Sequence, residues 1–310
     1  MQSNQQSNQN ALELLAQKGF EIVSTLEKKR YFYAFLKKES INYFFKIASE
    51  NNSNEFLLNE IQWNNQINEA LISTEDNKKP KIKIPIVTDS GIFNKKQYAI
   101  FEGLSVEKNI GNNTKVNPEF INYIPNIIDF IFWLKTLKIE LPLDKSKMFN
   151  HKTETLKERI LKFANFYAQA VDKKPHHLID VIKTTPFEGM SLSHCDIRPA
   201  HLFGLDGILG IIDGEWASNK IPEHYDIALC YLRIFVSTQN PEHANSLLKS
   251  YYSRCLQEHI NIEQFKNHFR GLLALRAIGG YCHAYLGKQI SKEHFELERK
   301  IVENDFKELN

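Results

Sequence analysis

The pattern of apolar residues changes along this 310-residue chain, and that change constrains the fold more than any other feature. Near the start, three alternating runs rich in aromatic and β-branched residues are separated by short polar stretches: 20–24, 30–36 and 42–48. Such runs predict three strands of an antiparallel meander. Beyond about residue 118 most segments show helical spacing instead. The sequence therefore predicts an α+β fold with a small β-rich N-lobe and a larger, mainly helical C-lobe.

The rest of the N-lobe follows the same pattern. A helix is predicted from Ser53 onwards, and two further strands, 81–89 and 96–103, with a turn between them at Ser90 and Gly91. The first ten residues are almost all Gln, Asn and Ser and predict a disordered tail. We therefore expect three segments: the tail 1–10, the N-lobe 11–104 and the C-lobe 105–310.

Charge and cysteine content exclude several classes of protein. Lys and Arg number 39 against 37 Asp and Glu, so no global field favours nucleic acid or an anionic membrane as a partner. The apolar window 120–139 contains Asn, Pro, Asp and Lys, which favours a core helix over a membrane span. The four cysteines are widely spaced, and the polar N-terminus lacks a secretory pattern. We expect a cytoplasmic protein without nucleic-acid or membrane partners.

A second local feature is a β-hairpin within residues 191–218. Asp-Gly at 206–207 separates two apolar runs, which is a strong hairpin signal. Asp196 precedes the first strand, His201 lies just inside it, and Asp213 ends the returning strand. Because the strands are antiparallel, these three side chains should converge. Two neighbouring carboxylates repel unless one is protonated or a cation lies between them, so the cluster indicates acid/base chemistry or a divalent metal.

Three motifs in this region carry a family resemblance: "HCDIRPAH" (194–201), "IIDGEWA" (211–217) and "YDIAL" (225–229). In this order they resemble the aminoglycoside phosphotransferase and choline kinase families, a branch of the bilobal protein-kinase-like fold. The resemblance implies that Asp196 orients or deprotonates a substrate hydroxyl and that Asp213 binds the Mg²⁺ of the nucleotide. It also implies that Asp226 braces the catalytic loop and that His194 is the packing histidine of that loop.

One position departs from the family pattern. His201 stands where the family has a second metal-binding Asn. Mg²⁺ prefers oxygen ligands, so an imidazole there favours weaker Mg²⁺ binding or a softer ion such as Mn²⁺. Arg198, three residues earlier, is suited either to holding a phosphate or substrate anion near the catalytic Asp196 or to pairing with a carboxylate.

A kinase-like N-lobe needs a lysine on its third strand and a helix glutamate to position that lysine. Lys46 is that lysine by strand order, and Glu60 is the best placed of the helix glutamates. By the same resemblance, Glu102 and Leu104 flank the segment that binds the adenine base through backbone groups.

The loop between the first two strands lacks the glycines of protein kinases. Ser24 and Thr25 are the candidates there for contacting nucleotide phosphates, with charge added by Lys28 and Lys29.

Three functions remain open from the sequence. The first is an ATP- or GTP-dependent phosphotransferase that uses Mg²⁺ or Mn²⁺ and acts on a hydroxyl of a small molecule such as an aminoglycoside, choline or sugar. A cationic substrate is one option, since acids such as Glu223 and Glu258 are available in the C-lobe. The second, motivated by His201, is a nucleotide-binding pseudokinase or regulator. The third is a metal-dependent hydrolase built on His194, Asp196, His201 and Asp213.

Overall fold

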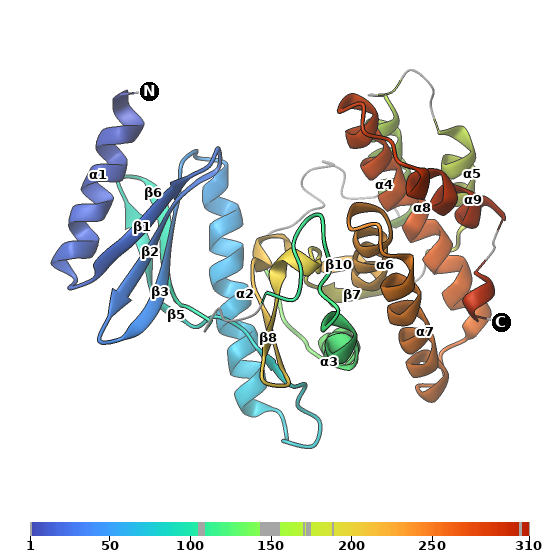
Figure 1. Ribbon diagram of the computed structural model, residues 1–310, viewed down its shortest axis with the longest axis horizontal. Helices are drawn as coiled ribbons and strands as arrows, with labels where there is room; N and C mark the ends of the chain where they lie inside the picture. The colour runs from blue at the N-terminus through green and yellow to red at the C-terminus, as the bar shows by residue number, and fades with distance from the viewer. Residues whose placement is uncertain are drawn as a thin grey trace.

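The computed structural model describes residues 2–104, 109–142, 156–169, 171, 175–187, 189–303 and 306–309. In Figure 1 a β-rich part coloured blue to cyan lies beside a larger part, green to red, that is mainly helical. The predicted bilobal α+β arrangement is thereby confirmed. The expected boundary between residues 104 and 105 meets the segment 105–108, which lies outside the described residues.

The small lobe is built on a five-stranded antiparallel sheet in the order β1-β2-β3-β6-β5. Its first three strands form the predicted meander. The helix α2 lies between this sheet and the large lobe (Figure 1). The elements of the small lobe are α1 (Gln2–Gln17), β1 (Glu21–Glu27), β2 (Tyr31–Lys38), β3 (Ile41–Ala48), α2 (Ser53–Ser73), β5 (Val87–Phe93) and β6 (Lys96–Glu102).

The expected disordered tail is wrong for residues 2–10, because α1 begins at Gln2. The C-terminal half of α1 supplies the reason: Ala11 and Leu15 are fully buried in the cluster that includes Leu36 and Phe45 of the sheet. Once these turns are anchored, each added residue contributes a hydrogen bond to an existing helix, and polar side chains need no burial there.

The run 81–89 does not form one strand. Its first part, β4 (Ile82–Lys83), pairs in parallel with β9 (Ile208–Ile211) of the large lobe, whereas β5 begins at Val87. The turn expected at Ser90 and Gly91 is also wrong, since both residues lie inside β5. The chain reverses at Asn94 and Lys95, which both have a positive φ, as a tight hairpin turn requires.

The large lobe contains two small sheets, β4-β9-β8 and β10-β7, and most of the helices. Ten of the fifteen residues of helix α3 are buried, as expected for a core helix in the apolar window that begins at Phe120. Within the described part of the chain, none of the helices combines the length and apolarity needed to cross a membrane. The elements are α3 (Phe120–Leu134), α4 (Leu156–Ala168), α5 (His176–Thr184), β7 (Met190–Ser193), η2 (Pro199–His201), β8 (Leu202–Leu205), β9 (Ile208–Ile211), η3 (Gly214–Trp216), β10 (Ser218–Pro222), α6 (Tyr225–Leu232), the π-helical η4 (Arg233–Ser237), α7 (Pro241–Gln257), α8 (Ile262–Leu286), α9 (Lys292–Glu303) and η5 (Lys307–Leu309).

Candidate functional site

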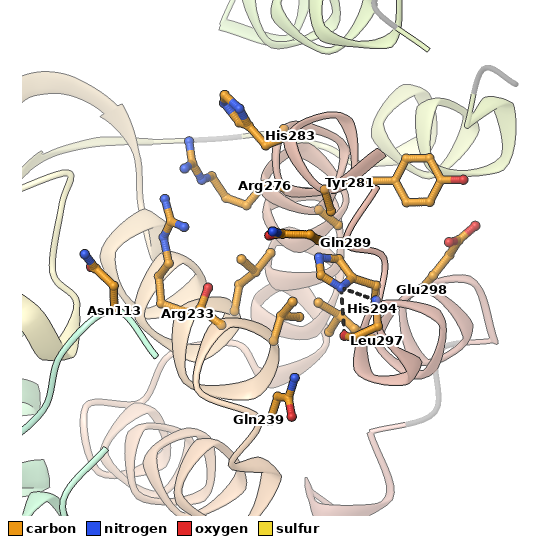
Figure 2. Close-up of a pocket in the computed structure, with 18 of the residues that line it drawn as sticks. Asn113, Arg233, Gln239, Arg276, Tyr281, His283, Gln289, His294, Leu297 and Glu298 are labelled. Carbon is orange, nitrogen blue, oxygen red and sulfur yellow. Dashed lines mark hydrogen bonds between the residues drawn. The ribbon is translucent and has the colours of Figure 1, made fainter. Parts of the chain in front are cut away.

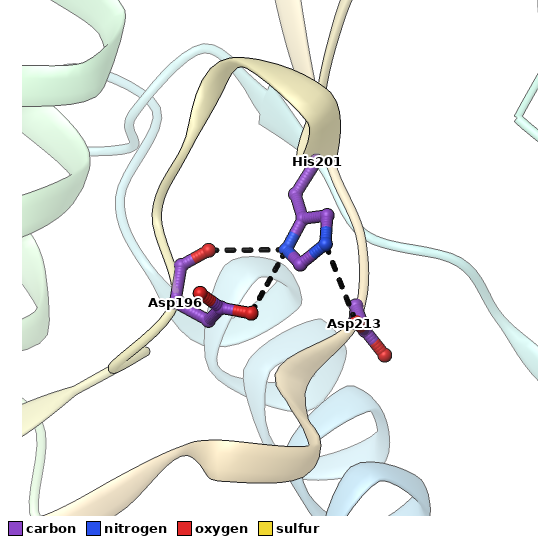
Figure 3. Close-up of side chains that lie close together, drawn as sticks. All are labelled: Asp196, His201 and Asp213. Carbon is purple, nitrogen blue, oxygen red and sulfur yellow. Dashed lines mark hydrogen bonds and ion pairs between the residues drawn. The ribbon is translucent and has the colours of Figure 1, made fainter. Parts of the chain in front are cut away.

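The predicted hairpin places three polar side chains at one end. Strands β8 and β9 pair with Leu202 opposite Ile211. At the open end, His201 Nδ1 lies 3.5 Å from Asp196 Oδ2, and His201 Nε2 lies 3.4 Å from Asp213 Oδ2 (Figure 3). The expected convergence is confirmed, although His201 belongs to η2, before the first strand, and Asp213 follows the end of the second.

The loop that carries Asp196 is held from α6. The carboxylate of Asp226 accepts the backbone amides of His194 at 2.8 Å and of Cys195 at 2.7 Å. The ring of His194 is fully buried and packs edge-on against Trp63 of α2, with the ring centroids 5.5 Å apart. This agrees with the bracing and packing roles that the resemblance implies for Asp226 and His194.

The loop after β9 is shaped by close packing. Asp213 has a left-handed φ of 67°. The following Gly214 is required sterically, because a Cβ there would lie 2.1 Å from Cδ1 of Trp63. From the same helix, Asn59 donates hydrogen bonds to the carbonyl oxygens of Glu215 at 3.2 Å and Ala217 at 3.0 Å. Helix α2 therefore fixes the position of Asp213 relative to the small lobe.

Lys46 on β3 reaches the same loop from the other side. Its Nζ lies 2.7 Å from Glu60 Oε2, 3.2 Å from Asp213 Oδ1 and 3.2 Å from Glu215 Oε2. The predicted partners Lys46 and Glu60 are thus brought together. Sequence reasoning did not assign Glu215 to this cluster, and its ion pair with Arg30 was not foreseen either. The available signal was its position, two residues after Asp213.

Burial and neighbouring charges act in opposite directions on this buried cluster. Burial lowers the pKa of Lys46, but the carboxylates of Glu60, Asp213 and Glu215 outweigh burial and hold that pKa well above its usual value. Burial raises the pKa of Glu60 to about 7, against the opposing effect of Lys46. Burial acts to raise the pKa of Asp213, but the charge of Lys46 outweighs burial and brings that pKa below the usual range. Lys46 and Asp213 are therefore charged at neutral pH.

The two aspartates of the cluster differ in their electrostatic surroundings. Burial raises the pKa of Asp196, although His201 and Arg198 oppose it. Arg198 Nη2 lies 3.3 Å from Asp196 Oδ2. A carboxylate of raised pKa is a better proton acceptor than one of ordinary pKa, so Asp196 is better suited to acid/base chemistry than Asp213.

The hydrogen bonds of His201 assign its tautomer. Its Nδ1 is 3.0 Å from the backbone oxygen of Asp196, and its Nε2 accepts from Arg198 Nε at 3.0 Å. A carbonyl accepts and a guanidinium donates, so Nδ1 carries the proton and the imidazole is neutral. Burial, which lowers the pKa of His201, acts in the same direction. The lone pair of Nε2 therefore accepts the hydrogen bond from Arg198, and Asp213 Oδ2 lies 3.4 Å from the same nitrogen.

Two groups of side chains have the composition of a cation site. One ligand atom each from Asp196, His201 and Asp213 lie within 4.8 Å of one another, and the same holds for Glu60, Asp213 and Glu215. The second group already surrounds the ammonium of Lys46. The first group, two carboxylates and a neutral imidazole, fits a divalent ion and suits Mn²⁺ better than Mg²⁺.

Ser24 and Thr25 lie elsewhere than expected. Both belong to β1, opposite Phe35 and Ala34 of β2, because this strand continues to Glu27. The expectation that they stand in the loop is wrong. Their side chains are exposed at this outer strand, and contact with phosphates stays a prediction.

The segment predicted to bind adenine follows β6. The backbone amide of Glu102 donates to the carbonyl of Ile86, and that of Gly103 to Asn42, each at 2.8 Å. These amides are engaged within the small lobe. Leu104 is buried and packs against Gly210 of β9, where the two lobes meet.

Known protein-family models and curated proteins yield no match to this sequence. Solved structures do match, over nearly the whole chain. An apo thermostable mutant of aminoglycoside phosphotransferase APH(4)-Ia has a TM-score of 0.64 at 12% identity and covers 94% of this chain and 97% of its own. The GDP and kanamycin complex of APH(2")-IIia has a TM-score of 0.62 at 14% identity, covering 96% and 99%.

A third similar structure is amicoumacin kinase hAmiN in complex with AMP-PNP, Ca²⁺ and Ami, with a TM-score of 0.62 at 12% identity, covering 96% of this chain and 97% of its own. At such identities the likeness concerns the fold. The chain therefore has the bilobal α+β protein-kinase-like fold seen in aminoglycoside phosphotransferases and amicoumacin kinase.

Proposed function

We propose that this protein is a phosphotransferase that moves the γ-phosphate of ATP or GTP to a hydroxyl group of a small molecule. The contacts of Lys46 support this proposal most directly: Nζ lies 2.7 Å from Glu60 and 3.2 Å from Asp213. This arrangement joins a strand and a helix of one lobe to the metal-binding loop of the other, as phosphoryl transfer by protein kinases requires. The similar folds that hold GDP or AMP-PNP are consistent with it.

The nucleotide would lie between the lobes. Lys46 would neutralise its α- and β-phosphates, positioned by Glu60, while the backbone near Glu102 and Leu104 would face the base. Asp213 and His201 would hold the divalent cation, Mg²⁺ or Mn²⁺. That cation, when bound, neutralises the charge that develops on the phosphate oxygens.

Asp196 would act on the acceptor. It would orient the substrate hydroxyl and take its proton as the hydroxyl oxygen bonds to the γ-phosphorus and the bond from that phosphorus to the bridging oxygen breaks. The raised pKa of the Asp196 carboxyl favours this role. Arg198, 3.3 Å from Asp196, would supply positive charge beside the transferring group.

Transfer of labelled phosphate tests the proposal. The protein is incubated with Mg²⁺ or Mn²⁺, γ-labelled ATP or GTP, and pools of hydroxylated metabolites and antibiotics. We expect one pool to be labelled, and Asp196→Asn to lower the rate by about 10²- to 10⁴-fold. Asp206→Asn is the matched control, because Asp206 lies in the exposed far turn of the same hairpin at a φ of 49°, which Asn tolerates. No label in any pool, or equal rates for the two variants, would contradict the proposal.

A nucleotide-binding regulator is the second candidate, and His201 favours it. The ring of His201 lies between Asp196 and Asp213 and accepts a hydrogen bond from Arg198. A protein of this kind would be stabilised by nucleotide without a metal and would transfer no phosphate. Thermal-shift titration with and without Mn²⁺ distinguishes the two candidates. The hydrolase alternative is less well supported, because the metal-capable group of the described residues does not include His194.

A further inference from the structure

The large lobe also contains a cavity of about 520 Å³. It lies among α6, the π-helical segment η4, α8 and α9 (Figure 2). Its volume is in the range of pockets that bind small molecules. Its charged and polar lining includes Asn113, Arg233, Arg276, His283 and Glu298.

This cavity adjoins the proposed catalytic loop. Asn113, which lines the cavity, accepts a hydrogen bond from Arg198 Nη1 at 3.4 Å, and Arg198 Nη2 lies 3.3 Å from Asp196. The charges of Asp196 and Arg198 also act on the guanidinium of Arg233, on the cavity wall. Asn113 and Arg198 thus connect the cavity to Asp196, which does not itself line it.

The described lining of the cavity includes two arginines and one acidic residue. Figure 2 shows the guanidinium groups of Arg233 and Arg276 on one side and Glu298 on the other. The carboxylate of Glu298 contacts Nε2 of the His177 ring. Arg276 donates to the hydroxyl of Tyr225 at 2.9 Å, which is a neutral partner. Among the described residues of the lining Glu298 is the acidic one, and Nε of Arg233 is buried without a hydrogen-bond partner.

Placing two guanidinium groups together has an electrostatic cost. Burial lowers the pKa of Arg233, and the nearby charge of Arg276 lowers it further. Arginine still stays protonated in proteins, so both groups keep their charge. An anion between them would offset this repulsion, and guanidinium groups match the geometry of carboxylate and phosphate oxygens.

We propose that this cavity binds an oxyanion, a carboxylate or a phosphate, through Arg233 and Arg276. The next step rests on the phosphotransferase function proposed above: the acceptor of that reaction is a hydroxylated acid rather than an amine. The acids considered earlier for a cationic substrate do not argue against this. Glu223 is 3.7 Å from Lys135, Glu258 is 2.8 Å from Arg254, and neither lines the cavity.

Calorimetric binding to the full-length protein, without nucleotide, tests the oxyanion site. The probes are gluconate and glycerate as carboxylates, glucose 6-phosphate and glycerol 3-phosphate as phosphates, and choline and kanamycin as amines. We expect one of the two anionic sets to bind, which identifies the oxyanion, and the amines not to bind. Arg233→Gln and Arg276→Gln should each weaken that binding by about tenfold or more, as expected for a lost charged hydrogen bond.

Arg299→Gln is the matched control, because Arg299 is exposed on α9, does not line the cavity and pairs with Glu303 at 3.1 Å. Arg276→Lys keeps the charge and should retain part of the binding. This variant keeps the test informative if Arg276→Gln folds poorly, and thermal melting reports the folding of each variant. Absence of anion binding, binding of the amines instead, or equal affinity in both glutamine variants and the control would overturn the proposal.

The same probes then serve as acceptors for labelled phosphate. Label transfer to the anionic set that binds supports both proposals. Anion binding that depends on Arg233, with no label in any pool, supports the oxyanion site and counts against the phosphotransferase. Label transfer to choline or kanamycin supports the phosphotransferase and overturns the acidic acceptor.

Discussion

Asp226 accepts the backbone amide of Cys195 at 2.7 Å, and Cys195 has a left-handed φ of 66°. A non-glycine residue in that conformation is strained, so the surrounding structure must hold it there. The adjacent amide of His194 reaches the same carboxylate at 2.8 Å. One buried aspartate on α6 thus fixes the backbone immediately before Asp196.

Asp226→Asn should therefore reduce both stability and activity. An Asn side chain has one acceptor oxygen, so a buried backbone amide would lose its partner, at a cost of about 1–3 kcal/mol in the free energy of unfolding. Urea denaturation measures the loss. The exposed Asp180, which pairs with Lys183, provides the control: Asp180→Asn should change stability by less than about 0.5 kcal/mol. Equal effects of the two changes would contradict the bracing role.

His201→Asn should change the preference for the metal. An amide oxygen replaces a neutral imidazole nitrogen beside Asp213, and Mg²⁺ prefers oxygen ligands. We expect the ratio of kcat/KM with Mg²⁺ to that with Mn²⁺ to rise on the order of tenfold. The control His259→Asn changes an exposed residue at a φ of 55°, where Asn is tolerated. An unchanged ratio in His201→Asn would show that this side chain does not contact the ion.

Features that depend on local pattern could be predicted from the sequence. The alternation in 20–48 predicts the meander, and the Asp-Gly turn with its flanking runs fixes the register that brings His201 to Asp213. Strand order then places Lys46 opposite α2 and near Glu60. In each case periodicity and short connections restrict the chain to few arrangements.

Features that depend on contacts between distant parts of the chain could not be predicted from the sequence. Arg30 and Glu215 are 185 residues apart, and no local pattern pairs them. The split of 81–89 into β4 and β5 follows from pairing with β9, much later in the chain. The cavity arginines lie on separate elements, η4 and α8, and come together only through helix packing. Charged residues on helices give no sequence signal of which cavity they line.

Lys46→Met should be strongly destabilising. It would leave Glu60, Glu215 and Asp213 close together without their shared cation, and removal of one member of a buried ion pair costs about 3–5 kcal/mol. The double variant Lys46→Met/Glu60→Gln should recover part of that loss, because one buried negative charge is removed with the positive one. Chemical denaturation of the single and double variants gives the coupling free energy.

The exposed pair Lys78 and Glu75 controls for loss of a lysine charge. Their side chains are 68% and 69% exposed, so Lys78→Met should change stability by less than about 1 kcal/mol. A Lys46→Met variant as stable as Lys78→Met would show that the buried cluster is not held by this charge.

Acid should destabilise the fold through His224. Burial, together with the charges of Lys135 and His268, lowers the pKa of this buried ring well below its usual value. Its other polar neighbours are Tyr251, with the hydroxyl 2.8 Å from Nδ1, and Glu223, 3.9 Å from Nε2. Below about pH 6.5 the side chain of His224 binds a proton in the unfolded chain but not in the folded one. The free energy of unfolding therefore decreases as the pH is lowered, by up to about 1.4 kcal/mol per pH unit from this group.

His224→Asn removes the titrating group and suits the left-handed φ of 68° at this position. It loses the contact with Tyr251, so its stability at pH 8 should be lower than that of the wild type. The difference in stability between pH 7 and pH 5, from urea denaturation at each pH, should nevertheless be smaller in the variant. Parallel pH profiles would show that His224 makes no such contribution.

Gly280 allows the cavity to be filled without disturbing its walls. It lies on α8, lines the cavity, and a Cβ at this position would meet no atom within 4 Å. Gly280→Ala should raise stability by about 0.5–1 kcal/mol, because alanine costs less backbone entropy in a helix than glycine. Gly280→Leu should keep a similar stability but place its side chain in the space proposed for the acceptor.

The two variants form a graded pair in which only the larger side chain obstructs binding. We expect the KM for the acceptor, and the dissociation constant of the anionic probe, to change little in Gly280→Ala and to rise by about tenfold in Gly280→Leu, a penalty of about 1.4 kcal/mol. The KM for the nucleotide should be the same in both, since the nucleotide would bind between the lobes, beside Lys46. A leucine that leaves acceptor and probe binding unchanged would place the acceptor outside this cavity, whatever the charge of its arginines.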